Sequence, residues 1–233
     1  MTERADRFGF PDGTDAGLPT VTILAHRSKS GGEEVAVSVE LSAGGERDHR
    51  ILTVRQADFD RLGLGNGPID PETYDELEHL AAVLGAMHCG ARLLVYSPNT
   101  RRALIRKIMR HGYSREEAEE GADRLEEAGL IDEDGYLEAE IDRCLRKLWG
   151  EARIREKLYT CGFGSDAMRR VPELLAEVDF AANCRALIEK QFGGLPDGDE
   201  EMRKLLSVLR RYGYRRDDIY VALREMRLDE AHR

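Results

Sequence analysis

The stretch Leu104–Tyr113 reads LIRKIMRHGY, and the chain repeats its pattern twice. Residues 154–163 read IREKLYTCGF, and residues 205–214 read LLSVLRRYGY. Each copy has two aliphatic residues four positions apart, followed by glycine and an aromatic residue. The three glycines follow one another at spacings of 50 and 51 residues: Gly112, Gly162 and Gly213. A nearly constant period of this size predicts a tandem array of similar structural units.

Each copy is typical of a helix, a glycine stop and a second helix. The aliphatic pair shares one helical face, as Leu104 and Ile108 do. The glycine can end the helix in a left-handed conformation, and the aromatic residue can fold back on it. Ser114 and Glu117 then have the spacing of a capping box that opens the next helix. Two further apolar columns continue the match into that helix, namely Ala118, Met168 and Ile219, and Leu125, Leu175 and Met226.

From this period we predict a mainly α fold, an elongated tandem array of three three-helix repeats preceded by a small antiparallel β meander. The repeats should span residues 71–129, 130–177 and 178–233. The expected helices lie near residues 71–96, 100–111, 115–128, 133–147, 150–160, 165–177, 178–191, 199–211 and 216–228. Pro172 lies inside one of them and should kink or shorten it, because proline cannot complete the helical hydrogen bonds.

The N-terminal part has a different pattern. Residues 1–19 are rich in Gly, Asp and Pro, so we predict a disordered tail. A small β-rich domain should cover residues 20–70, with strands in 20–27, 34–41 and 48–54 separated by glycine pairs at 31–32 and 44–45. A short helix at 56–62 should help to cover the sheet. The glycine-rich residues 62–67 favour a turn over a phosphate loop, and Asp70 should cap the next helix.

Composition narrows the class of protein. The 233 residues include 34% charged and 41% hydrophobic side chains, which is typical of a globular, helix-rich chain. No uninterrupted run of about 18 apolar residues is present, and the N-terminus lacks the apolar core of a secretory signal. Four cysteines lie far apart, without the spacing of a zinc site, so we expect free thiols in a reducing cytoplasm: Cys89, Cys144, Cys161 and Cys184.

The net charge is −10, yet basic residues gather on the middle helix of each predicted repeat. Arg102, Arg106 and Arg110 recur at intervals of four and therefore share one helical face. Two interpretations stay open: a solvated helix face balanced by glutamates, or a positive track for phosphates or an acidic partner. The candidate binding residues are Arg101, Arg102, Arg106, Lys107, Arg110, Arg146, Lys147, Arg153, Arg155, Lys157, Arg203, Lys204, Arg210 and Arg211.

No arrangement of side chains suggests catalysis, a metal site or a cofactor. His79 and His88 lie on one helix with Cys89 beside His88, but ordinary partly buried residues explain them better. Consecutive acids at 132–134 are better explained as helix capping than as a cation site.

Several motifs together resemble the RecX family, regulators of the bacterial RecA recombinase. They are KIMRHGY at 107–113, LEEAGLIDEDGY at 125–136, KLWG at 147–150, RIREKL at 153–158 and CGF at 161–163. The resemblance covers roughly residues 93–226. Leu137, Gly135 and Pro172 depart from the family pattern, and the chain is more acidic than expected.

The resemblance implies a non-enzymatic regulator that binds along the groove of the RecA–DNA filament. It further implies reduced ATP hydrolysis and strand exchange, with the basic middle helices making the contacts. Single- or double-stranded DNA could be bound alone or through the filament, and we expect a monomer with no membrane contact. Two alternatives remain: a helical repeat protein that binds DNA directly, and a helical protein-interaction scaffold.

Overall fold

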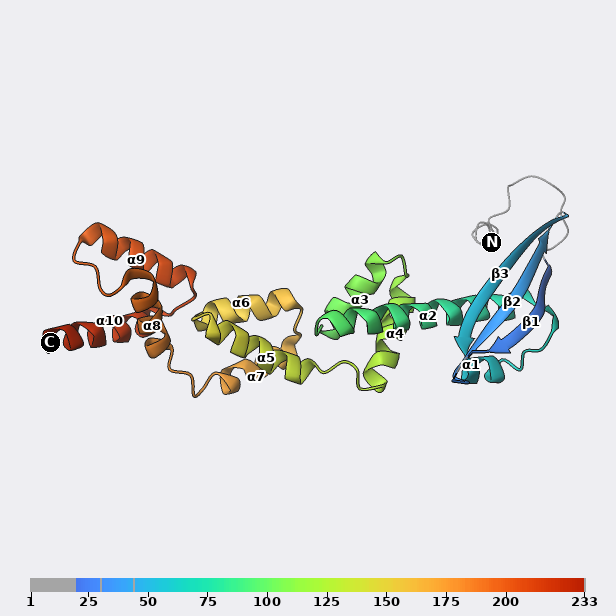
Figure 1. The fold of residues 1–233 in the computed structure, drawn as a ribbon, viewed down its shortest axis with the longest axis horizontal. Helices are drawn as coiled ribbons and strands as arrows, with labels where there is room; N and C mark the ends of the chain where they lie inside the picture. Colours follow the sequence, from blue (N-terminus) through green and yellow to red (C-terminus); the bar gives the residue numbers. More distant parts are fainter. Residues whose placement is uncertain (1–19, 30, 44, 233) are drawn as a thin grey trace. The chain divides into compact units, whose positions relative to one another are not determined.

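A computed structural model describes residues 20–29, 31–43 and 45–232. This part of the chain is mainly helical, with an antiparallel sheet near its N-terminal end (Figure 1). The predicted disordered tail, residues 1–19, lies outside it. Two compact units divide the chain. The first unit contains residues up to Arg92 together with Lys107–Leu125, and the second contains Leu93–Arg106 and Glu126–Arg233.

The sheet of the first unit has strand order β3-β2-β1-β4, and every neighbouring pair is antiparallel. The predicted meander is confirmed for the first three strands, but the fourth was missed. It spans only three residues, in a segment whose glycines and proline are typical of a turn. It becomes a strand because Ile69 pairs with Val21 and Gly67 with Ile23. The strands are β1 (Thr20–Ser28), β2 (Glu34–Ala43), β3 (Glu46–Arg55) and β4 (Gly67–Ile69).

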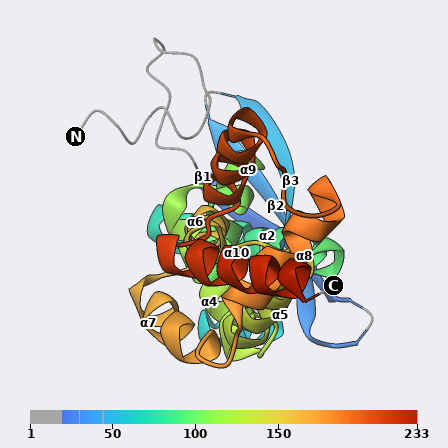
Figure 2. The ribbon, with the colours of Figure 1, turned by 90° about the vertical axis from the view of Figure 1, so that its left-hand side faces the viewer.

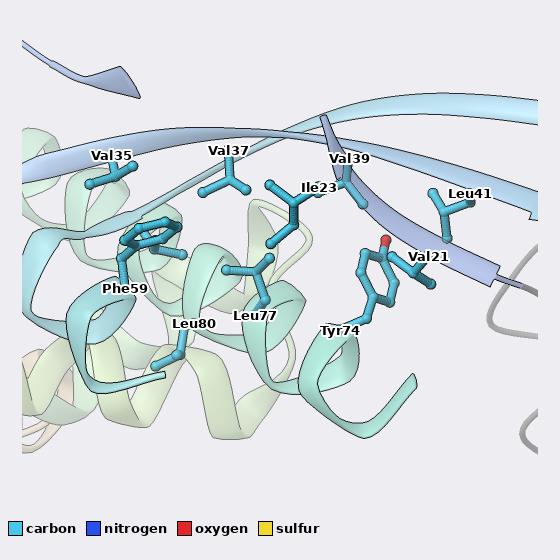
Figure 3. Close-up of a cluster of buried hydrophobic side chains, with 11 residues drawn as sticks. Val21, Ile23, Val35, Val37, Val39, Leu41, Phe59, Tyr74, Leu77 and Leu80 are labelled. Carbon is cyan, nitrogen blue, oxygen red and sulfur yellow. The ribbon is translucent and has the colours of Figure 1, made fainter. Parts of the chain in front are cut away.

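One face of this sheet is covered by α1 (Gln56–Arg61) and the first half of α2 (Pro71–Tyr96). Strand β2 alternates, so that its apolar side chains Val35, Val37, Val39 and Leu41 all point into one core. Phe59 of α1 and Leu77 of α2 enter the same cluster (Figure 3). Asp70 caps α2 as predicted, because its carboxylate accepts a hydrogen bond from the Thr73 amide at 2.9 Å.

Helix α2 is the one described helix that is long and apolar enough to cross a membrane by length and composition. Its first half lies against the sheet. Further along, a Cβ added at Gly90 would meet Leu125 at 2.6 Å and Ile108 at 3.0 Å, so the helices of this unit pack very closely there. Its contact with the sheet and its close packing at Gly90 are those of a helix in a protein core.

The helices from α2 onward form three successive groups of three, namely α2–α4, α5–α7 and α8–α10. Their bounds agree with the prediction to within a few residues. Helix α7 contains Pro172 and ends at Leu174, three residues before its predicted end, which agrees with the expected shortening. The bounds are α3 (Arg101–Arg110), α4 (Arg115–Glu127), α5 (Glu133–Arg146), α6 (Glu151–Cys161), α7 (Ser165–Leu174), α8 (Phe180–Phe192), α9 (Asp199–Arg211) and α10 (Arg216–Ala231).

The repeated apolar columns are confirmed as buried positions. The aliphatic pairs of α3, α6 and α9 are fully buried, as are the later columns to within 7% exposure. Separate apolar cores hold α5–α6–α7 together and α8–α9–α10 together. The ribbons of α8, α9 and α10 are drawn in orange and red in Figure 2. The three repeat glycines adopt positive φ angles of 99°, 92° and 88°, as a left-handed helix stop requires. The capping box of α4 is also present, since the Ser114 amide donates to Glu117 at 2.8 Å.

Candidate interaction surface

The start of α6 is joined directly to the turn between α9 and α10. The Gly150 amide donates to the Tyr212 carbonyl at 2.8 Å, and the Ala152 amide donates to the Gly213 carbonyl at 3.1 Å. The first amides of a helix have no partner within it, and the last carbonyls have none either. Here the two turn carbonyls accept from amides at the start of α6, while the last carbonyls of α9 accept from amides of the turn itself, as that of Leu209 does from Tyr214 at 3.2 Å. We call this contact the second junction.

An equivalent contact joins the start of α3 to the turn between α6 and α7, within the second unit. Fully buried Thr100 donates its hydroxyl to the Cys161 carbonyl at 3.1 Å and accepts from the Ala103 amide at 3.1 Å. The Arg101 amide donates to the Glu133 carboxylate at 2.6 Å. We call this the first junction. Its hydrogen bonds run through side chains, whereas the second junction also has direct hydrogen bonds between backbone groups.

The two junctions set the order of the middle helices. The carboxyl end of α9 meets the amide end of α6, and the carboxyl end of α6 meets the amide end of α3. Opposite ends of the helix dipoles therefore face each other at both places, which is the favourable arrangement. The helices that carry most of the predicted basic residues thus follow one another end to end.

Two glycines make the second junction close enough for backbone contact. A Cβ at Gly150 would lie 2.4 Å from the Gly213 carbonyl, and a Cβ at Gly213 would lie 2.4 Å from the Arg153 amide nitrogen. Tyr214 strengthens this contact by donating its hydroxyl to the Leu148 carbonyl at 2.8 Å. Burial raises the pKa of Tyr214, so the hydroxyl keeps its proton.

The basic residues of α3 fall into two groups. Arg102, Arg106 and Arg110 are exposed and make no ion pair within the described residues. Arg101 is half-buried, and its guanidinium lies 3.3 Å from the Glu126 carboxylate. Lys107 is also half-buried. The exposed group keeps the spacing of four that places it on one side of the helix.

Most basic residues predicted around α6 have partners inside the protein. Arg155 pairs with Glu151 at 2.8 Å, and Lys157 lies 3.8 Å from the buried carboxylate of Glu140. Glu140 is only 2% exposed and also pairs with Arg143. Arg143 and Lys157 therefore neutralise a buried acid inside the repeat, so their charges are less available to a binding partner. At the end of α5, Arg146 is exposed without an ion pair in the part of the chain that the structure describes.

Arg153 is held between aromatic rings. Its guanidinium lies 4.2 Å from the centre of the Trp149 ring and 5.0 Å from that of Tyr212, while Lys147 approaches Trp149 at 5.1 Å. Cation–π contacts of this kind fix the arginine beside the second junction. The charge pattern of the sequence predicts Arg153 as a binding residue but does not indicate its ring partners. The KLWG motif before α6 was the available signal.

In α9, Arg203, Arg210 and Arg211 are exposed and unpaired among the described residues, whereas Lys204 pairs with Glu200 at 2.8 Å.

The acids at the start of α5 act as predicted: Asp132 caps the helix through the Gly135 amide at 2.8 Å. Gly135, which departs from the family pattern, is thus the residue whose amide the cap uses. A Cβ at Gly135 would lie 2.2 Å from the Asp132 carboxylate. All four cysteines are free.

No protein-family model matches the chain. Regulatory protein RecX of Halorhodospira halophila is 32% identical over 132 residues, which cover 56% of this chain and 81% of that protein. Regulatory protein RecX of Pelodictyon phaeoclathratiforme is 31% identical over 143 residues, covering 60% and 88%.

Two solved structures share the fold. A crystal structure of a regulatory protein RecX superposes with a TM-score of 0.64 at 16% identity, covering 88% of this chain and 99% of that chain. The crystal structure of RecX from Lactobacillus salivarius gives a TM-score of 0.54 at 17% identity, covering 63% and 97%. On the sequence identity and coverage of its relatives, the chain belongs to the RecX family of regulatory proteins.

Proposed function

We propose that this chain is a non-enzymatic inhibitor of the RecA recombinase that binds along the groove of the RecA–DNA filament. The observation that carries the proposal is α3, which has five basic residues and no acid. Arg102, Arg106 and Arg110 on this helix are exposed and unpaired among the described residues. Unpaired arginines on a rigid helix can form charge-assisted hydrogen bonds to phosphates or carboxylates without first breaking an internal ion pair.

The end-to-end order of the middle helices supports an extended contact. Repeats place equivalent helices in series, which suits a partner that is itself repetitive. Arg203, Arg210 and Arg211 of α9 would extend the contact made by α3. The paired residues Arg155 and Lys157 would contribute less, because their charge is already compensated. We expect the chain to act as a cytoplasmic monomer.

One observation favours a second candidate, direct binding of DNA. Trp149 and Tyr212 flank Arg153, and arginines beside aromatic rings are typical of surfaces that bind single-stranded nucleic acid. Such binding would weaken steeply with salt, because it releases counterions from the phosphates.

The test is ATP hydrolysis by RecA on single-stranded DNA, with this protein added up to one molecule per recombinase subunit. We expect the wild-type chain to inhibit hydrolysis. The triple variant Arg102→Glu, Arg106→Glu, Arg110→Glu should require at least tenfold more protein for the same inhibition. Direct DNA binding is tested separately by fluorescence anisotropy of labelled DNA without recombinase, at salt concentrations from 50 to 300 mM. Binding that weakens steeply with salt would support the DNA-binding alternative.

The matched control reverses three other exposed arginines that make no ion pair within the described residues: Arg27, Arg55 and Arg92. This control changes the net charge by the same amount and should inhibit like the wild type. Absence of inhibition by the wild-type chain would refute the proposed function. Equal loss in both triple variants would show that net charge matters and the α3 face does not.

A further inference from the structure

Helix α10 exposes large apolar side chains on the side away from its core. Ile219, Ala222 and Met226 are buried, as an amphipathic helix requires. On the other side, Tyr220 is 68% exposed and Leu228 is 49% exposed. Apolar residues of this size at helical spacing form a stripe that water covers only at a cost in free energy.

The exposed apolar side chains of α10 line two hollows of the surface. One, of about 360 Å³, lies between α9 and α10 and is lined by Leu206, Arg210, Arg216, Asp217, Ile219, Tyr220 and Leu223. The other, of about 300 Å³, continues along α10 and is lined by Tyr220, Leu223, Arg224, Arg227 and Leu228. Tyr220 and Leu223 line both hollows, and we call the two together the α10 groove. From residue 216 to 228 it follows roughly 18 Å of helix.

The lining of the α10 groove is positively charged, in a chain whose net charge is −10. Four arginines on it are exposed and make no ion pair within the described residues: Arg210, Arg216, Arg224 and Arg227. The nearby acids Glu225 and Asp229 pair with Arg185 of α8, at 3.0 and 2.7 Å. Asp217 is the one acid that lines the groove.

This surface is not a general property of the repeat. Aligning the repeat glycines places Glu119, Asp123, Glu126 and Glu127 of α4 at the positions of Tyr220, Arg224, Arg227 and Leu228. The corresponding residues around α7 are Arg169, Glu173, Ala176 and Glu177. Only the last repeat combines exposed apolar side chains with arginines at these positions. Because the other two repeats form the same three-helix fold without this combination, the fold itself does not require it.

We propose that the α10 groove binds an amphipathic helix of a partner protein, with apolar side chains facing the groove and acidic side chains facing the arginines. A straight apolar groove along a helix is the usual receptor for such a segment. Charge complementarity at the rim selects acidic partners. The floor disfavours nucleic acid, because Leu206, Leu223 and Leu228 are aliphatic and stacking of successive bases needs several aromatic rings.

The test uses the full chain and three fluorescein-labelled synthetic peptides of 18 residues. One is an amphipathic helix of leucine and glutamate, the second has the same composition in a scrambled order, and the third has lysine in place of glutamate. Anisotropy titrations up to 200 µM should show binding of the first peptide, at least tenfold tighter than either of the others. A labelled thymidine 20-mer is titrated in parallel.

Two variants locate the site. Tyr220→Ala with Leu228→Ala should weaken the acidic peptide at least fivefold, and Arg224→Glu with Arg227→Glu should weaken it at least tenfold. Arg27→Glu with Arg55→Glu is the charge-matched control and should bind like the wild type. All of these side chains are exposed, so the fold should be retained, and circular dichroism checks this.

Three results would overturn the proposal. The first is that the acidic peptide does not bind. The second is that the scrambled peptide binds equally well. The third is that the Tyr220→Ala, Leu228→Ala variant loses binding of the thymidine 20-mer but keeps binding of the peptide. The titrations contain no recombinase and no ATP. Their outcome is therefore independent of the proposed inhibition of RecA.

Discussion

The two junctions solve the same problem with different chemistry. Both place the amide end of a middle helix on a glycine turn of the following repeat. The second junction does so with backbone hydrogen bonds between Gly150 and the turn at Gly213, at distances that exclude side chains. The first uses the Thr100 hydroxyl and the Glu133 carboxylate. Tight backbone contact restricts the residue type, whereas side-chain contact tolerates variation.

The two junctions also affect the proposed binding surface. Middle helices can present arginines in series only while both junctions hold. A change at the second junction should therefore act mainly on stability. A change at the first should be partly absorbed by flexible neighbours such as the Arg106 side chain, which lies 3.2 Å from the position of a Cβ at Gly162.

The largest effect is expected for Gly150→Ala. Its Cβ would lie 2.4 Å from a carbonyl that cannot move without breaking the junction, so we expect a loss of about 3 kcal/mol in the free energy of unfolding. Urea denaturation followed by fluorescence measures it, because the single tryptophan, Trp149, lies at this junction. Gly164→Ala is the control, since Gly164 precedes α7 as Gly150 precedes α6 but has open space around it. Equal losses would contradict the steric explanation.

A smaller effect is expected for Gly162→Ala at the first junction. The positive φ of 92° disfavours alanine, but the nearest groups are the Thr100 hydroxyl at 3.0 Å and a flexible arginine. We expect about 2 kcal/mol, mostly from the backbone conformation. Gly193→Ala, with φ of 75° and no atom within 4 Å, isolates that backbone contribution. A loss at Gly162 as large as that at Gly150 would remove the distinction between the junctions.

Tyr214→Phe makes the second junction resemble the first, where Phe163 occupies the matching position. The variant loses the hydrogen bond to the Leu148 carbonyl and should cost about 1.5 kcal/mol. Tyr159→Phe is the control, because Tyr159 is 68% exposed. An unchanged midpoint of denaturation for Tyr214→Phe would mean that water replaces the lost hydroxyl without cost.

The smallest effect concerns alkaline pH. Burial raises the pKa of Cys184, in the core of the last repeat, from 9.0 to about 12. The folded state therefore keeps the thiol protonated at a pH where the unfolded state releases the proton. The contribution of Cys184 to stability should be constant below pH 8 and fall by about 0.8 kcal/mol between pH 8 and 9.5, continuing until the pH passes the folded pKa. In Cys184→Ala that part of the slope should vanish in urea titrations at several pH values.

Much of the fold was predictable because it is local. Apolar spacing, glycine stops and caps determine each helix within a few residues, and Pro172 shortens α7 through its own backbone. Strand β4 was not predictable, since Gly67–Ile69 becomes a strand only by pairing with β1. The candidate site was predictable in charge but not in exposure. Arg102 and Lys157 both lie on basic middle helices, yet only Lys157 lies near a buried carboxylate, that of Glu140 on another helix.

The sequence by itself determined that three helical repeats follow a small sheet, because periodicity and capping act between residues a few positions apart. It also determined which helices are basic. The tertiary structure alone decided which basic residues are neutralised by acids of another helix, how Gly150 and Gly213 join successive repeats, and how α9 and α10 together line a hollow. Those properties depend on contacts between different helices, and no local pattern encodes their distances.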